Sequence, residues 1–206
     1  MRQSYNLFLS MLQSTKSIMT LYDYCEQKIN PPIDYSDLLR WQWVQAVSAL
    51  DKFIHDIVRI GMLDIYSGYR QPTKKYSSFS INMDIHSQIL ESIMNRINDI
   101  TIFERQIVTQ HSHLSFQDPD KISDALSHIW LEEQKWQEIA KKMGLSDTHV
   151  KTKLKNISIR RNQIAHQGDY PSTQMQRQGI TKEDIIEVIE FVETVGKSIF
   201  SCISLP

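Results

Sequence analysis

The sequence predicts an all-α protein that folds as a single domain. Apolar residues recur at helical spacing along nearly the whole chain, and the polar–apolar alternation of half-buried strands is nearly absent. The chain has 206 residues, 41% of them hydrophobic, which is enough for one apolar core and short for two full domains. We therefore expect residues 1–206 to form one helical domain.

Two long helices are expected at the start of the chain. The first spans about Tyr5–Ile29 and stops at Pro31-Pro32, because a proline disfavours helical geometry in the residue before it. The second spans about Ser36–Tyr66 and ends at Ser67-Gly68, where glycine can adopt the left-handed conformation that ends many helices. The apolar face of the second helix comprises Val44, Val47, Leu50, Ile54, Ile57 and Val58.

The middle of the chain combines loops and helices. Residues Tyr69–Ser80 are rich in serine, lysine and turn-forming residues and predict an exposed loop, after which helical spacing resumes over about Asn82–His111. A second polar loop covers Ser112–Asp120, in which Asp118 is placed to cap a helix that has Pro119 in its first turn. Helical segments then continue to Met143, and Gly144 is expected to stop them.

Two further helices are expected near the end of the chain. One begins at Ser146 and extends to Gln167, with Gly168 placed for a left-handed residue after its last turn. Thr181 and Asp184 have the spacing of a capping box. They predict the start of a last helix that reaches about Cys202.

Composition excludes several classes of protein. The formal net charge is −1, so a nucleic-acid site must depend on a local basic patch. No signal-peptide pattern or membrane-spanning apolar run is present, which predicts a cytoplasmic protein without membrane association. Cys25 and Cys202 are expected to be free thiols, and His111-Ser112-His113 lacks the accompanying ligands of a metal site. We expect no metal and no other cofactor.

Two charged residues fall in apolar rows of different helices. Residues three, four and seven apart share a helix face, so Asp51 lies in a row with apolar residues of the second helix, and Arg161 does so in the helix after Ser146. Arg160 instead neighbours Lys153, Asn156 and Gln163. Because a buried charge requires a partner, we predict an ion pair between Asp51 and Arg161.

Histidines accompany both charged residues. His55 lies one turn after Asp51, and His166 lies one turn after Asn162, so each helix can offer a polar pair to the same cleft. From the residues alone, an alternative is that the Asp51–Arg161 pair only fixes the register of the helices and that His166 satisfies the helix end. The spacing itself is weak, because Arg105 and His111 match it as well.

The segment Arg161-Asn162-Gln163-Ile164-Ala165-His166 resembles the motif of the HEPN superfamily. Gly168-Asp169 and the segment Ala49-Leu50-Asp51-Lys52-Phe53-Ile54-His55-Asp56 resemble the RiboL-PSP-type HEPN subgroup. The resemblance is strongest over Ser36–Tyr66 and Trp130–Phe200. It implies a bundle of four to six helices that forms a homodimer with a composite active site at the interface.

The resemblance also implies a function, the cleavage of RNA without a metal ion. His166 would serve as general acid or base, Arg161 would stabilise negative charge on the phosphate, Asn162 would position phosphate or imidazole, Asp51 would hold Arg161, and His55 is a further catalytic candidate. Many such proteins are toxins or phage-defence effectors controlled by an antitoxin or a sensor protein. Others are inactive and serve as interaction or RNA-binding modules.

A helix-turn-helix DNA-binding regulator is the rival interpretation. Residues 138–146 resemble the first helix and turn of that motif, with Gly144 at the turn, and Lys151, Lys153 and Lys155 would contact phosphates. The length of the following helix, which continues into Arg161 and His166, argues against it. The same lysines and Arg160 would serve a ribonuclease as an RNA-binding rim.

Overall fold

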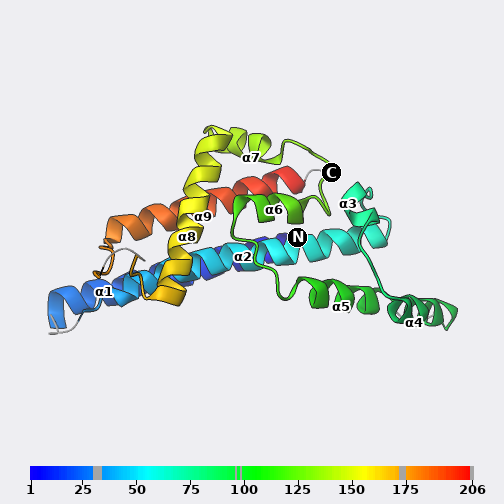
Figure 1. Cartoon of the computed structure of the whole chain (residues 1–206), viewed down its shortest axis with the longest axis horizontal. Helices are drawn as coiled ribbons and strands as arrows, with labels where there is room; N and C mark the ends of the chain where they lie inside the picture. Colours follow the sequence, from blue (N-terminus) through cyan, green and yellow to red (C-terminus); the bar gives the residue numbers. More distant parts are fainter. Residues whose placement is uncertain (30–33, 96, 98, 172–174, 205–206) are drawn as a thin grey trace.

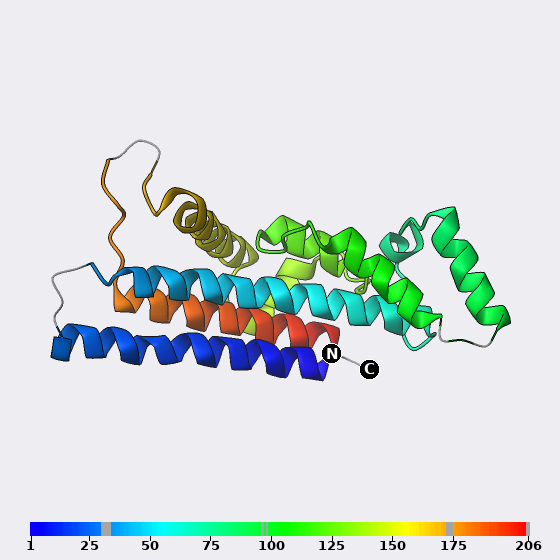
Figure 2. The same cartoon turned by 90° about the horizontal axis from the view of Figure 1, so that it is seen from below.

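The computed structural model describes residues 1–29, 34–95, 97, 99–171 and 175–204. These residues contain nine α-helices, one π-helical segment and no strand, which confirms the all-α prediction. Three long helices lie side by side along the long axis of the molecule: α1 (Arg2–Tyr24), α2 (Asp37–Tyr66) and α9 (Lys182–Ile203) (Figure 2). No described helix has both the length and the apolar composition required to cross a membrane.

The core is built around α2. Large apolar side chains of this helix are fully buried, among them Leu50, Phe53, Ile54 and Ile57. On one side α1 approaches α9 closely at Gly196. A Cβ atom on this residue would lie only 2.3 Å from the Phe8 ring. A residue without a side chain therefore fits best where these two helices meet.

The second layer lies on the face of α2 opposite α1 (Figure 2). It contains α6 (Pro119–Leu126) and α8 (Asp147–Gln167), and α8 crosses α2 at a steep angle (Figure 1). The short helix α7 (Lys135–Met143) precedes α8 and packs on both α8 and α9. Buried Val150, Leu154 and Ile157 form the apolar face of the first half of α8.

The predicted starts and ends of these helices are confirmed. Ser146 caps α8 by accepting a hydrogen bond from the His149 amide, and Thr181 and Asp184 form the capping box of α9. The stops at Gly144 and Gly168 have φ angles of +68° and +61°, in the left-handed region that glycine tolerates best.

The middle of the chain contains more helices than the sequence predicts. The segment expected as one helix over residues 82–111 is divided into α4 (Met83–Met94) and α5 (Ile100–His111), with Asn95 and Asp99 at the facing ends. The expected loop before it contains the short helix α3 (Lys74–Ser77), which Thr73 caps. The helix total therefore exceeds the expected four to six.

The first predicted helix also changes character near its end. After Tyr24 the backbone continues as a π-helical segment, η1 (Cys25–Ile29). The predicted stop at Pro31-Pro32 lies outside the described residues.

Candidate active site at the C-terminal end of α8

The last two turns of α8 present Asn162 and His166 to solvent. The two residues lie one turn apart, and both side chains are exposed. Lys155 and Ile159 continue this face toward the start of the helix, and Ile159 is 47% exposed. We call these four residues the motif face. His166 is exposed and makes no side-chain hydrogen bond with any described residue.

Arg161 lies beside the motif face and is joined to it. Its side chain is partly buried, and Nη1 donates a hydrogen bond of 3.1 Å to Oδ1 of Asn162. Its Nε is buried and has no hydrogen-bond partner among the described residues. The contact therefore places a guanidinium and an amide side by side, one turn before His166.

A buried ion-pair cluster follows the motif directly. Asp169 is completely buried, and its Oδ2 accepts hydrogen bonds from Nε of Arg40 at 2.9 Å and from Nη2 of Arg160 at 3.2 Å. Arg40 belongs to the first turn of α2 and is 4% exposed. The carboxylate therefore links the start of α2 to the last turns of α8. Charge-assisted contacts of this kind have well-defined geometry.

The backbone after α8 reinforces this link. Asp169 has a φ angle of +67°, which aspartate tolerates better than most residues. Its amide donates to the carbonyl of Gln163 at 3.1 Å, and its carbonyl accepts from the amide of Gln178 at 3.0 Å. Arg177 donates to the carbonyl of Gly168 and also pairs with Asp37 at the start of α2. The end of α8 that carries His166 is thus held from several sides.

A comparison with protein-family models decides the affiliation. The RiboL-PSP-HEPN model matches residues 10–205, which includes both α2 and the whole of α8. The chain belongs to the RiboL-PSP-HEPN family. Comparisons with curated proteins and with solved structures give no significant match.

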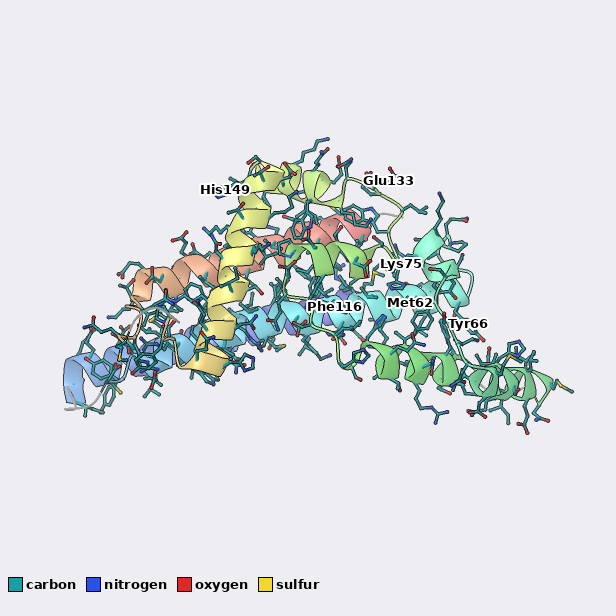
Figure 3. The ribbon with its side chains drawn as sticks, in the orientation of Figure 1. Met62, Tyr66, Lys75, Phe116, Glu133 and His149 are labelled. Atoms are coloured by element: carbon teal, nitrogen blue, oxygen red, sulfur yellow. The ribbon has the colours of Figure 1, made fainter. Side chains whose placement is uncertain are left out.

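Asp51 of this HEPN domain has other partners than the sequence predicts. Its Oδ1 accepts a hydrogen bond from the Phe116 amide at 2.5 Å, and its Oδ2 accepts one from Nε2 of Gln117 at 3.2 Å. Figure 3 shows Phe116 against α2, on the loop before α6. The predicted ion pair with Arg161 is wrong, because this loop occupies the carboxylate.

His55 lies next to Asp51, as expected from their spacing. Its Nε2 is 3.7 Å from Oδ1 of Asp51, and its ring centroid is 4.3 Å from that of Phe116. It lines a pocket of about 340 Å³ together with Lys52 and His111. Asp51 and His55 thus contact the loop before α6, and His55 shares its pocket with residues of α5. None of these contacts brings Asp51 or His55 to the cleft predicted for His166.

The assignment of the two arginines is reversed in the HEPN domain. Arg160, which the sequence places beside Lys153, Asn156 and Gln163, is the arginine that binds a buried acid. Among the described residues, Arg161 has a side-chain hydrogen bond with its neighbour Asn162 alone. One signal for this was present in the sequence. One helical row of α2 contains Arg40, Val47 and Asp51. The spacing that places Asp51 on the inner side of the helix therefore places Arg40 there too, and a buried cation requires an acidic partner.

The lysines of α8 do not form one continuous rim. Lys153 pairs with Glu187 of α9 at 2.5 Å, on the side of α8 that faces α9, and Lys151 pairs with Asp147 at 3.3 Å. Lys155 alone of the three lies exposed on the motif face. α8 has 21 residues and continues unbroken from Asp147 through Arg161 and His166, as the sequence predicts.

The described residues offer no obvious metal centre. They contain no cluster of three or more His, Cys, Asp or Glu side chains placed to hold a metal ion. Cys25 and Cys202 form no disulfide. The motif face and Arg161 beside it offer imidazole, amide, guanidinium and ammonium groups.

Proposed function

We propose that this HEPN domain is an endoribonuclease that cleaves RNA by acid–base catalysis without a metal ion. The observation that carries the proposal is the motif face, where an exposed histidine stands one turn from an arginine–asparagine contact. Imidazole titrates near neutral pH and suits proton transfer. Arg161 and Asn162 provide donors for the oxygens of a phosphate.

The reaction requires two proton transfers on opposite sides of the phosphorus. The ribose 2′-OH attacks the adjacent phosphorus while a base accepts its proton, and the P–O5′ bond breaks as an acid protonates the leaving oxygen. The products are a 2′,3′-cyclic phosphate and a 5′-hydroxyl. Arg161 stabilises the charge that develops on the non-bridging oxygens. DNA lacks the nucleophile and is not a substrate.

Among the described residues of one chain, His166 is the one histidine on the motif face, so we propose that a homodimer supplies both groups. In a symmetric dimer the same surface of each copy meets its equivalent, which brings His166 of two α8 helices to one cleft. The exposed side chain of Ile159, in the middle of the motif face, provides an apolar contact for such an interface. Lys155, on the same face, contacts the phosphates on either side.

Control by an antitoxin or a sensor protein follows naturally from this arrangement. A partner that covers the motif face would separate the two copies and mask His166 at the same time. A toxin or phage-defence role is compatible with such control.

The test is RNA cleavage by the purified protein in the presence of EDTA. His166→Ala should reduce the rate by about 100-fold or more, since acid–base catalysis contributes about 10²–10⁴-fold. Arg161→Ala should reduce it by about 100-fold or more as well, since loss of one donor to the developing charge costs about 10²–10³-fold. Matched controls are His113→Ala and Arg105→Ala, which alter exposed residues of the same types on or next to α5. A single 2′-deoxynucleotide at the cleaved position should block the reaction.

Four outcomes would contradict the proposal. Cleavage that persists in both motif variants would place the active site elsewhere. Loss of cleavage with EDTA would show a metal requirement. Binding of RNA without cleavage would identify an inactive interaction module, and tight binding of duplex DNA alone would favour the regulator.

A further inference from the structure

A groove runs beside the motif face, between α8 and α9. Its volume is about 530 Å³, and it extends along α8 from His149 to Gln163, a distance of about 21 Å at the helical rise of 1.5 Å per residue. Figure 3 labels His149 at the far end, near the start of α8. His166 follows Gln163 by about one turn, so the near end of the groove adjoins the motif face.

The groove combines apolar surface with uncharged polar side chains. Trp43, Ile157 and Val188 contribute apolar surface. Hydroxyl and amide groups line it as well, from Thr152, Asn156, Gln163 and Gln178. Apolar walls with a few convergent hydrogen-bonding groups are typical of sites for small planar ligands. Amide side chains in particular can bond to the edges of nucleobases.

The charges of the groove favour a base over a bare phosphate chain. Lys153 and Glu187 neutralise each other at 2.5 Å, and the Asp184 carboxylate accepts the Thr181 amide in the capping box. Of the two cations that line the groove, Lys153 and Arg160, Arg160 lies closer to the C-terminal end of α8. With as many carboxylates as cations along its walls, the groove has no strong field for a polyanion.

Arg160 offers a planar surface inside this groove. Its guanidinium lies 4.8 Å from the centroid of the Trp43 ring, and contacts with Asp169 and the Gly179 carbonyl fix its plane. Its Nε is buried without a partner among the described residues. Unstacked bases of single-stranded RNA pack on guanidinium planes of this kind.

We propose that the groove binds one unstacked base of the RNA strand, next to the phosphate that is cleaved at His166. This inference rests on the proposed function and adds a specificity determinant to it. Arg160 packs against the base, and Asn156, which is exposed and free of hydrogen bonds with described residues, bonds to its edge. The groove therefore sets the base preference of cleavage.

The test uses a short single-stranded oligodeoxynucleotide, which the proposed reaction does not cleave, in which each base is removed in turn. With the wild-type protein, loss of one base should weaken binding about tenfold, since stacking contributes about 1–3 kcal/mol per base. Asn156→Glu places a carboxylate one turn from Arg160 and should weaken binding of the intact strand about tenfold. It should also remove the sensitivity to the missing base. Gln137→Glu makes the same charge change at an exposed site on α7, outside the groove, and should alter neither property.

The outcomes separate this inference from the proposed function. If Asn156→Glu keeps the wild-type binding and the wild-type dependence on the removed base, the groove is not the base site, whatever the cleavage assay gives. If the binding pattern changes as expected but RNA is never cleaved, the proposed ribonuclease activity fails and the base site stands. Where RNA is cleaved, mapping of cleaved positions in a random-sequence RNA should show an altered base preference for Asn156→Glu.

Discussion

Replacement of Asp169 by asparagine should destabilise the protein strongly. The substitution keeps an acceptor oxygen, and asparagine also tolerates the φ of +67° at this position, so the change removes little besides the charge. The Arg40 and Arg160 contacts of 2.9 and 3.2 Å each correspond to a gross attraction of about 5 kcal/mol at an effective dielectric constant of about 20. Desolvation offsets most of this attraction. Disrupting a buried pair by removing one partner costs about 3–5 kcal/mol, and we expect about 3 kcal/mol because the asparagine oxygen can accept both arginine hydrogen bonds that Oδ2 accepts.

Unfolding followed by circular dichroism measures this loss. For a chain of this size it corresponds to a fall in Tm of about 6–12 °C. Asp124→Asn is the matched control, since Asp124 pairs with Lys75 at 2.7 Å but its side chain is 65% exposed. Exposed pairs of this kind contribute about 0–1 kcal/mol. Equal losses for the two variants would refute the view that burial makes the Asp169 cluster a principal stabilising contact.

Two further predictions concern the core. Gly196→Ala should lower the free energy of unfolding by about 1–2 kcal/mol, because its Cβ would meet the buried Phe8 ring at 2.3 Å and overpacking outweighs the gain in helix propensity. Denaturant unfolding measures this loss, and a variant as stable as the wild type would contradict it. Burial, and then the neighbouring His111, lower the pKa of His128 to about 4. In the unfolded chain the pKa of this histidine has its ordinary value of about 6.5. Below about pH 6.5 the unfolded chain therefore binds more protons than the folded protein. Stability should be complete above about pH 6.5 and fall as the pH drops toward 4, by about 2 kcal/mol from this group at pH 5.

The acid dependence has a direct control. His128→Gln removes the titrating ring, so the fall in stability between pH 6.5 and pH 4 should become smaller. His86 is exposed on α4, and His86→Gln should leave the pH profile unchanged. A His128→Gln profile that is parallel to that of the wild type would show that other groups cause the acid loss.

Much of the fold could be predicted because its signals are local. The residues that begin and end helices interact with backbone groups within one turn, so their positions alone indicate the helix bounds. They are Ser146, Thr181, Gly144 and Gly168. The long apolar row of α2 likewise predicts a central helix. The division of residues 82–111 into two helices was missed, since Asn95 and Asp99 are compatible with a helix interior as well as with its ends.

The partners of the charged residues could not be predicted in the same way. The helical rows identified Asp51 as an acid on the inner side of α2, and the same rows contain Arg40. Which cation meets which acid depends on loops that are remote in sequence. The amide of Phe116, before α6, donates a hydrogen bond to the carboxylate of Asp51. The turn after α8 places Asp169 between Arg40 and Arg160.

The sequence by itself determined the helical class, the helix caps and the resemblance of residues 161–166 to the HEPN motif, because each depends on residues within a few turns. Only the tertiary structure decided that Arg160 is the arginine bound to a buried acid, that the motif faces solvent, and that a groove adjoins it. The physical reason is that a buried charge pairs with whichever opposite charge the packing brings within about 3–4 Å. Helical spacing predicts only the direction in which a side chain points, and not the residue that it meets there.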